Sequence, residues 1–169
     1  AKGDQWVPGE ALSQVSRPIL RESTLAGTEG TPFAARFWPD GTPRLSAYEF
    51  QAMQMSACHR EGELRCGSCH TMHGDEPDMQ LRAGDRNQPC MDCHVSTELS
   101  AAGSSGGHGA HVGVDGRAPD CLDCHMPRIV YGLLEGMITH RIDSPRVDHL
   151  APDPSLEQPD ACTRCHVDR

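Results

Sequence analysis

The stretch Cys66-Gly67-Ser68-Cys69-His70 introduces a five-residue pattern that the chain uses four times. The later copies are Cys90-Met91-Asp92-Cys93-His94, Cys121-Leu122-Asp123-Cys124-His125 and Cys162-Thr163-Arg164-Cys165-His166. Successive copies begin 24, 31 and 41 residues apart. Because these intervals differ, the repeated unit is the pattern itself and not a larger structural repeat.

The rest of the composition leaves little material for an apolar core. Leu, Ile, Val and Phe account for 27 of the 169 residues, and aromatic residues for 4%. Charged chains in which these four types fall below about 20% tend to be disordered, because they cannot bury enough side chain to offset the entropy of folding. We therefore expect something other than side chains to complete the core.

Charge and hydropathy argue against binding to nucleic acid and against a membrane-spanning segment. The formal net charge is −9, from 15 basic and 24 acidic residues, and no cluster of Lys and Arg stands out, which argues against binding to nucleic acid. The longest apolar run, Ile129-Val130-Tyr131-Gly132-Leu133-Leu134, is far shorter than the roughly 18 residues that a membrane span needs. We expect neither a nucleic-acid partner nor a membrane span.

The repeated pattern is the attachment signature of c-type haem. On a helical turn the first, fourth and fifth residues share one face, so two thiols can bond to one edge of a porphyrin while the imidazole ligates its iron. The pattern predicts four haem c groups, whose apolar surfaces would replace the missing core. The attachment residues would be Cys66, Cys69, Cys90, Cys93, Cys121, Cys124, Cys162 and Cys165, with His70, His94, His125 and His166 as proximal ligands.

Two other kinds of site also use paired cysteines. The 20 residues between Cys69 and Cys90 fit a zinc ribbon, in which four thiolates hold the metal. Redox-active disulfides are a further alternative. Neither of these requires the histidine that follows all four pairs, whereas haem ligation does. The histidines therefore favour haem over zinc and over disulfides.

The chain resembles the multihaem cytochromes c of the doubled-CXXCH type over about residues 36–169. Besides the four motifs, the resemblance rests on His70-Thr71-Met72-His73, on Cys124-His125-Met126-Pro127-Arg128-Ile129-Val130-Tyr131-Gly132 followed by His140-Arg141-Ile142, and on Pro159-Asp160-Ala161-Cys162. It begins at Arg36-Phe37-Trp38-Pro39-Asp40-Gly41-Thr42-Pro43. It implies an exported electron carrier with little regular secondary structure, in which short α-helices surround closely stacked haems with two histidine ligands each.

Six further histidines can supply the sixth ligands of the four irons: His59, His73, His108, His111, His140 and His149. We expect His73 and His140 first, because they lie in segments that carry the resemblance. His73 follows His70 too closely to bind the same iron from the opposite side, so it would ligate another haem. His111 comes next, ahead of His108, and His59 and His149 compete for the fourth position. Histidines left over would be surface residues that titrate near pH 6.5.

Cys58 is the one cysteine outside the four motifs. With His59 it could form a one-thiol version of the motif and bind a fifth haem. A buried thiol beside a haem is the interpretation that the two-thiol signature favours. An intermolecular disulfide is the remaining alternative.

The chain divides chemically at residue 57. Residues 1–57 contain no Cys and no His, and we assign them to a haem-free, extended N-terminal arm and first helix. Residues 58–169 hold all nine Cys and all ten His and form the tetrahaem-binding region. One helix is predicted from a capping box at Ser46 and Glu49 to a stop at Gly62.

The six spare histidines are enough to occupy the sixth coordination position of all four irons. An iron ligated in this way has no position for a substrate, which favours electron transfer over catalysis. We expect an electron carrier, and not an enzyme, that works between an exported donor and an extracytoplasmic acceptor. The alternative is a small multihaem reductase with one open iron. A further version is a polymeric wire, in which the arm packs on the next copy and a spare histidine ligates a haem of the neighbour.

The first residue is Ala1 and not Met, as in a mature chain after cleavage of a signal peptide at a small residue. We therefore expect a periplasmic or extracellular protein. Its partners would be redox proteins or an extracellular electron acceptor, together with further copies of itself.

Overall fold

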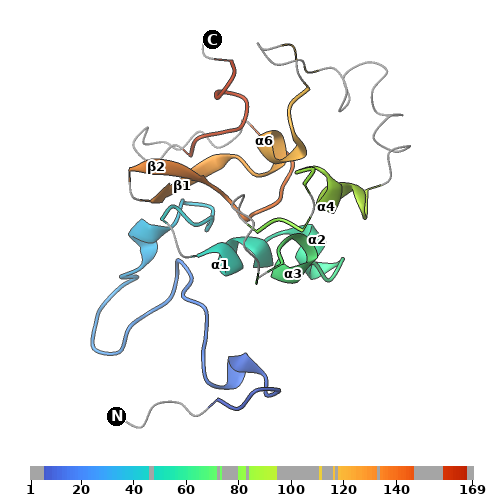
Figure 1. Cartoon of the computed structure of the whole chain (residues 1–169). Coiled ribbons are helices and arrows are strands. Elements are labelled where there is room, and N and C mark those ends of the chain that lie inside the picture. Colours follow the sequence, from blue (N-terminus) through green and yellow to red (C-terminus); the bar gives the residue numbers. More distant parts are fainter. Residues whose placement is uncertain are drawn as a thin grey trace.

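Figure 1 shows the computed structural model of the chain. The structure describes residues 6–45, 48–71, 73, 80–82, 84–94, 111, 116, 118–132, 134–146 and 158–166. Regular secondary structure is sparse in these ranges, and none of their helices is long and apolar enough to cross a membrane. The elements are η1 Leu12–Gln14, η2 Ala34–Arg36, α1 Glu49–Gln54, α2 Ala57–Arg60, α3 Cys66–Cys69, α4 Gln88–Met91, α6 Cys121–His125, β1 Arg128–Gly132 and β2 Glu135–Ile138.

β1 and β2 form an antiparallel hairpin in the middle of the molecule (Figure 1). Val130 pairs with Met137, and the register shifts between Arg128 and Val130. A bulge of this kind disturbs the strict alternation of side chains between the two faces of a strand. Ile129 and Val130, which are neighbours in sequence, are accordingly both buried.

The core forms where the segment around Trp38 lies against β1. Trp38 clusters with Ile129 and Val130, and its indole N–H donates to the carbonyl of Ile129 over 3.1 Å. Phe37, also buried, meets the ring of Tyr48 edge-on at 5.1 Å between ring centres. This part of the N-terminal segment therefore packs against the hairpin, where its large aromatic rings are buried.

A tight turn holds Trp38 in place. Gly41 has φ +86°, a left-handed conformation that favours glycine. The N–H of Trp38 donates to the carbonyl of Thr42 over 2.7 Å. The carboxylate of Asp40 accepts the backbone N–H and the hydroxyl of Thr42, both at 2.9 Å. The turn thus follows from the local preferences of Asp and Gly.

The segment predicted as one helix forms two helices. α1 ends at Gln54, and α2 begins after Ser56, whose backbone is extended with φ −78° and ψ 138°. Ser56 is only 1% exposed, and its Oγ accepts the N–H of Ile142 at 2.8 Å. The expectation of one continuous helix is wrong, because this tertiary hydrogen bond holds Ser56 outside the helical conformation.

The structure also shows how the segment predicted as one helix begins and ends. Ser46, on which the expected capping box depends, lies outside the described residues, and Tyr48 occupies the N-cap without a side-chain hydrogen bond. At the other end α2 stops at Arg60, and the N–H of Gly62 donates to the carbonyl of Cys58 over 3.1 Å. A Cβ atom at Gly62 would lie 2.8 Å from that oxygen, so the predicted glycine stop has a steric reason.

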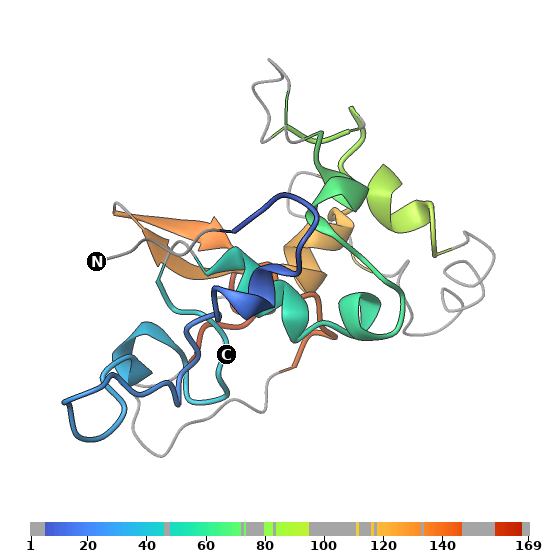
Figure 2. The same ribbon diagram turned by 90° about the horizontal axis from the view of Figure 1, so that it is seen from below.

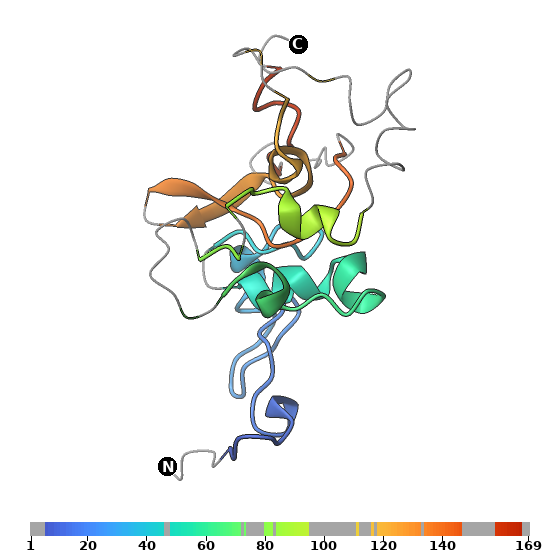
Figure 3. The same ribbon diagram turned by 45° about the vertical axis from the view of Figure 1, so that its right-hand side comes forward.

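The N-terminal segment before η2 extends from one end of the molecule, opposite the segment 158–166 (Figures 1 and 3). Seen from below in Figure 2, it runs beneath α1. In α1 the side-chain amide of Gln51 donates to the carbonyl of Ile19 over 3.3 Å. The apolar side chains of the N-terminal segment are largely exposed, namely Trp6, Val7, Leu12, Leu20 and Leu25. None of residues 6–33 is buried, so this part contributes no core.

Candidate haem sites

The four Cys-x-x-Cys-His motifs adopt the same helical turn. The backbone N–H of the histidine donates to the carbonyl of the first cysteine over 2.9 Å for His70, 2.8 Å for His94 and 2.9 Å for His166. In the third motif His125 is the last residue of α6. Each motif therefore places two sulfur atoms and an imidazole on one face of a turn, which is the arrangement that attachment to one porphyrin requires.

Polar side chains within or just before the motifs cap these turns. In the first motif Ser68 Oγ accepts the N–H of Arg65 at 3.1 Å, and in the third Asp123 Oδ2 accepts the N–H of Asp120 at 3.0 Å. Asp160 caps the fourth motif by accepting a backbone N–H at 2.8 Å. Sequence reasoning missed these residues, although a short polar side chain at the start of a turn is a recognised signal.

The first motif lies next to the second. Burial raises the pKa of the Cys69 thiol, and the charge of Cys93 raises it further. Arg82, between the two motifs in sequence, folds back onto the first: its guanidinium donates to the carbonyl of Gly67 over 2.8 Å, and its N–H to the carbonyl of Cys69 over 2.9 Å. The connecting chain is thereby tied to the turn of the first motif.

The second motif lies next to the third. Asn87 bridges them: its side-chain oxygen accepts the N–H of Cys121 at 2.8 Å, and its amide donates to Asp120 Oδ1 over 3.2 Å. The thiols of Cys90 and Cys121 lie close enough to influence each other. Burial, followed by the effect of Cys121, raises the pKa of the Cys90 thiol to about 11.

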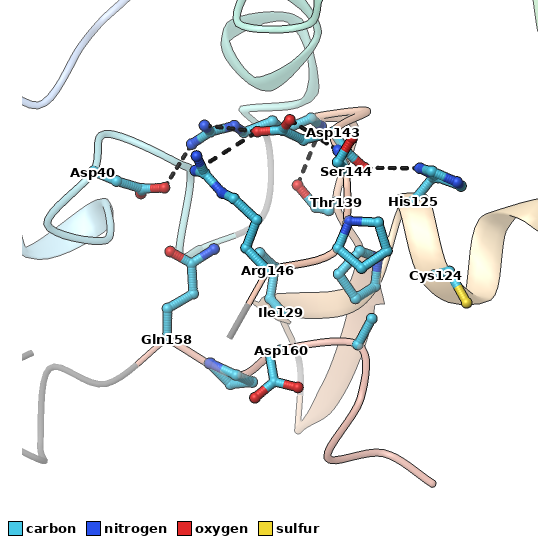
Figure 4. Close-up of a pocket in the computed structure, with 15 residues that line it drawn as sticks. Asp40, Cys124, His125, Ile129, Thr139, Asp143, Ser144, Arg146, Gln158 and Asp160 are labelled. Carbon is cyan, nitrogen blue, oxygen red and sulfur yellow. Dashed lines mark hydrogen bonds and ion pairs between the residues drawn. The ribbon is translucent and has the colours of Figure 1, made fainter. Parts of the chain in front are cut away.

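The third motif lies next to the fourth. Burial raises the pKa of the Cys124 thiol, as do the charges of Asp123, Cys162 and Cys165. Arg164 forms an ion pair with Asp123 at 3.9 Å. A pocket lies between α6 and residues 158–161, and Figure 4 shows Cys124 at its edge.

These contacts arrange the motifs in a row that follows their order in the chain. In Figures 1 and 3, α3, α4, α6 and the segment 158–166 follow one another along one side of the molecule. Each motif contacts or electrostatically influences the next, so neighbouring motifs in sequence are also neighbours in space.

The ring of His140 lies beside that of a proximal histidine. Its ring centre is 6.3 Å from that of His70, and the two ring planes are inclined at 34°. Burial lowers the pKa of His140, against the opposing charge of Glu49. The backbone of Ile138 also opposes this shift by raising the pKa. The Nδ1 atom of His140 is buried and has no hydrogen-bond partner among the described residues. Burial favours the neutral imidazole, the form that ligates metals.

Two other histidine rings are oriented by backbone carbonyls. Nδ1 of His125 lies 2.9 Å from the carbonyl oxygen of Asp143, and Nδ1 of His59 lies 2.6 Å from that of Leu64. Because a carbonyl can only accept, Nδ1 carries the proton and the lone pair of Nε2 is left for a metal. Both His59 and the expected proximal ligand His125 therefore have the tautomer that a metal ligand needs.

The remaining candidates are not brought together with a proximal histidine. His73 and His111 are exposed, and within the described ranges no contact places either ring beside an attachment motif. His108 and His149 lie outside the described residues. Among the six spare histidines, the described contacts place the ring of His140 beside His70 and fix the tautomer of His59.

The zinc and disulfide alternatives would both use the cysteines of the four motifs. All nine cysteines are described and none forms a disulfide. No three His, Cys, Asp or Glu side chains in the described ranges lie close enough to hold one metal ion. The thiols of Cys69, Cys90 and Cys124 have raised pKa values, whereas redox-active cysteines have lowered ones.

Cys58 lies among the thiols of the first two motifs. It is half-buried in α2, and its charge acts on both Cys69 and Cys90. This position agrees with a thiol packed beside the haem groups. The described geometry shows no second thiol on the α2 turn, as the sequence already implies.

Comparisons with protein families, with curated proteins and with solved structures find no match for this chain. The interpretation of the sites therefore rests on the chain itself. Its donor set fits haem c, because each turn offers two thiols and one imidazole, and because the ring of a second histidine, His140, lies 6.3 Å from that of His70.

Proposed function

We propose that the protein transfers electrons through four covalently bound haem c groups arranged in series. The observation that carries this proposal is the row of motifs, in which each attachment turn lies beside the next in sequence order. A bound haem supplies an iron that accepts and releases one electron without a change in the polypeptide. The polypeptide would hold the haems, orient them and separate them from solvent.

The residues of each motif have distinct roles in this proposal. The two cysteines would fix each porphyrin by thioether bonds, so the spacing between neighbours is set by the polypeptide. The proximal histidine would ligate the iron and, at the third site, the Asp143 carbonyl holds the imidazole of His125 in one tautomer and orientation. With a histidine on both sides the iron has no position for a substrate.

The row also suggests where electrons enter and leave. The first and fourth motifs occupy its two ends, at α3 and at residues 162–166, and the other two lie between them. Electron donors and acceptors would dock at these ends. Because the chain carries a net charge of −9, a basic partner would be attracted and its binding would weaken with added salt. We place the protein in the periplasm or outside the cell.

The first experiment counts and classifies the haems. The full chain is produced with a c-type haem maturation system, its haem content is measured as the pyridine haemochrome, and near-infrared magnetic circular dichroism reports the axial ligands. We expect four low-spin haems per chain with two histidine ligands each and no binding of carbon monoxide. A haem-free protein would reject the proposal, and a haem that binds carbon monoxide would favour the reductase.

The order of the row is tested by exciton coupling between neighbouring haems in Soret circular dichroism. The double variant Cys90→Ala/Cys93→Ala removes an internal site, and Cys162→Ala/Cys165→Ala removes an end site. In a linear row, loss of the second haem leaves one neighbouring pair, whereas loss of the fourth leaves two. Equal loss of coupling in both variants would contradict the linear order while leaving haem binding intact.

A further inference from the structure

The rings of His70 and His140 stand apart by the distance that two ligands of one iron would have. Their ring centres are 6.3 Å apart. An imidazole nitrogen lies about 2.0 Å from the metal that it ligates, and the ring centre about 1 Å beyond it, so two rings on opposite sides of one metal have centres about 6 Å apart. The observed separation therefore matches the one expected for two imidazoles that ligate one iron from opposite sides.

His140 is held at this position from both sides. Ser56 Oγ contacts the carbonyl of His140 at 3.4 Å and accepts the N–H of Ile142 at 2.8 Å. Before His140, the N–H of Thr139 donates to the carbonyl of Pro127 over 3.0 Å. The residue therefore sits in an anchored segment that packs against α1 and the hairpin, and not in a free loop.

The segment after His140 is anchored as well. Arg141, whose side chain is 17% exposed, pairs with Asp40 at 2.5 Å and with Asp143 at 2.9 Å. It also donates to Thr42 Oγ1 over 2.7 Å. These bonds tie residues 139–143 to the turn beside Trp38. A ligand whose backbone is fixed in this way costs little entropy when it coordinates.

We propose that His140 is the sixth ligand of the haem held by Cys66, Cys69 and His70. This inference rests on the proposed function, because it needs a haem at the first motif. It assigns one distal histidine to one iron, and it makes coordination of the first haem depend on residues that follow the third motif. Both ligands of the first iron then come together only after the hairpin has formed.

The test compares His140→Ala with Met137→Ala, an exposed residue on β2 three positions earlier. We expect both variants to retain four haems per chain by pyridine haemochrome. In His140→Ala one haem of the four should become high-spin and bind one equivalent of carbon monoxide, and added imidazole should restore the low-spin spectrum. Met137→Ala should keep all four haems low-spin.

A second variant assigns the iron. In the double variant Cys66→Ala/Cys69→Ala, which lacks the first haem, His140→Ala should produce no additional high-spin haem. If one of the three remaining haems becomes high-spin, His140 serves another site and the pairing is wrong. If His140→Ala leaves four low-spin haems in the otherwise unchanged chain, His140 is not a ligand at all.

Two further readouts keep the result interpretable. If His140→Ala does not fold, His140→Met supplies a ligand of similar size, and its near-infrared spectrum should show one haem with one histidine and one methionine ligand. Four unchanged bis-histidine spectra from that variant would overturn the inference. Failure of the proposed function would look different, because the unmodified chain would then carry no haem.

Discussion

At the scale of single residues, a few buried polar side chains decide how the chain is arranged. Ser56 interrupts a helix that the local sequence favours, because its hydroxyl bonds to the segment after β2. Asn87 joins the second and third motifs through both atoms of its side-chain amide. Each of these hydrogen bonds connects residues far apart in sequence. Each therefore fixes the relative position of two segments, which a local cap does not do.

Replacing Ser56 with alanine should destabilise the protein. The change removes the acceptor for the N–H of Ile142, and an unpaired amide in the interior lowers the free energy of unfolding by about 1–2 kcal/mol. Denaturant unfolding of the haem-loaded chain measures this, with Ser16→Ala, at an exposed arm position, as the control. Equal stability of both variants would show that the hydrogen bond to Ser56 does not hold the two segments together.

Replacing Asn87 with alanine should loosen the contact between the second and third sites. Both side-chain hydrogen bonds to the start of α6 are lost, which we expect to lower the free energy of unfolding by about 1–2 kcal/mol. The neighbouring Gln88→Ala, which loses only a bond to Asp92 within its own turn, serves as the control. An unchanged Soret exciton signal and unchanged stability in Asn87→Ala would contradict the bridging role.

At the scale of elements, the molecule consists of short turns fixed to one hairpin. The helices that carry the first three motifs span four or five residues each, too few to be stable alone. Their positions depend on contacts with other segments and on the caps at their starts. The hairpin carries the core cluster, and residues 139–143 after it link the core to the first and third motifs.

Arg141 connects the segment after β2 with the turn beside Trp38, and we expect its replacement to destabilise the protein. Arg141→Met removes its bonds to Asp40, Thr42 and Asp143, and leaves the partly buried carboxylate of Asp40 and the exposed carboxylate of Asp143 without this partner. Because the site is only partly screened by solvent, we expect a loss of about 1–3 kcal/mol in the free energy of unfolding. Arg17→Met, at an exposed position in the N-terminal segment, should have no measurable effect in the same unfolding assay. A similarly small effect of Arg141→Met would mean that the ion pairs are surface contacts only.

At the scale of the whole molecule, the row of motifs and the N-terminal segment lie at positions suited to head-to-tail association. The segment before η2 extends from one end and exposes several apolar side chains, and the fourth motif lies at the opposite end. We propose that this segment contacts the next copy of the chain. Contacts of this type that do not close a ring produce filaments.

Deletion of residues 1–33 tests this association. The deletion stops before Phe37 and Trp38, so the core around the hairpin remains complete. We expect the truncated chain to keep four haems and to lose large assemblies in light scattering. A truncated chain that assembles to the same size as the full chain would exclude the N-terminal segment as the contact.

The sequence by itself predicts the chemistry of the sites. The four motifs specify which sulfur atoms and which imidazoles share a face, because all of these residues lie within one turn and local hydrogen bonds shape that turn. The low content of apolar residues likewise predicted a small core. The turn at Asp40-Gly41 and the stop at Gly62 could be predicted for the same reason, since they depend on the backbone preferences of a few adjacent residues.

Tertiary structure alone decided what depends on residues distant in sequence. Sequence reasoning placed Trp38 in an arm whose packing partner it left open, and Ser56 within a helix, because it had no information about β1 or Ile142, their partners in space. It also left open which histidine faces which motif, whereas the fold brings His140 within 6.3 Å of His70, 70 residues away. The physical reason is that local preferences act over one turn of the chain, while packing and hydrogen bonding between segments determine which turns become neighbours.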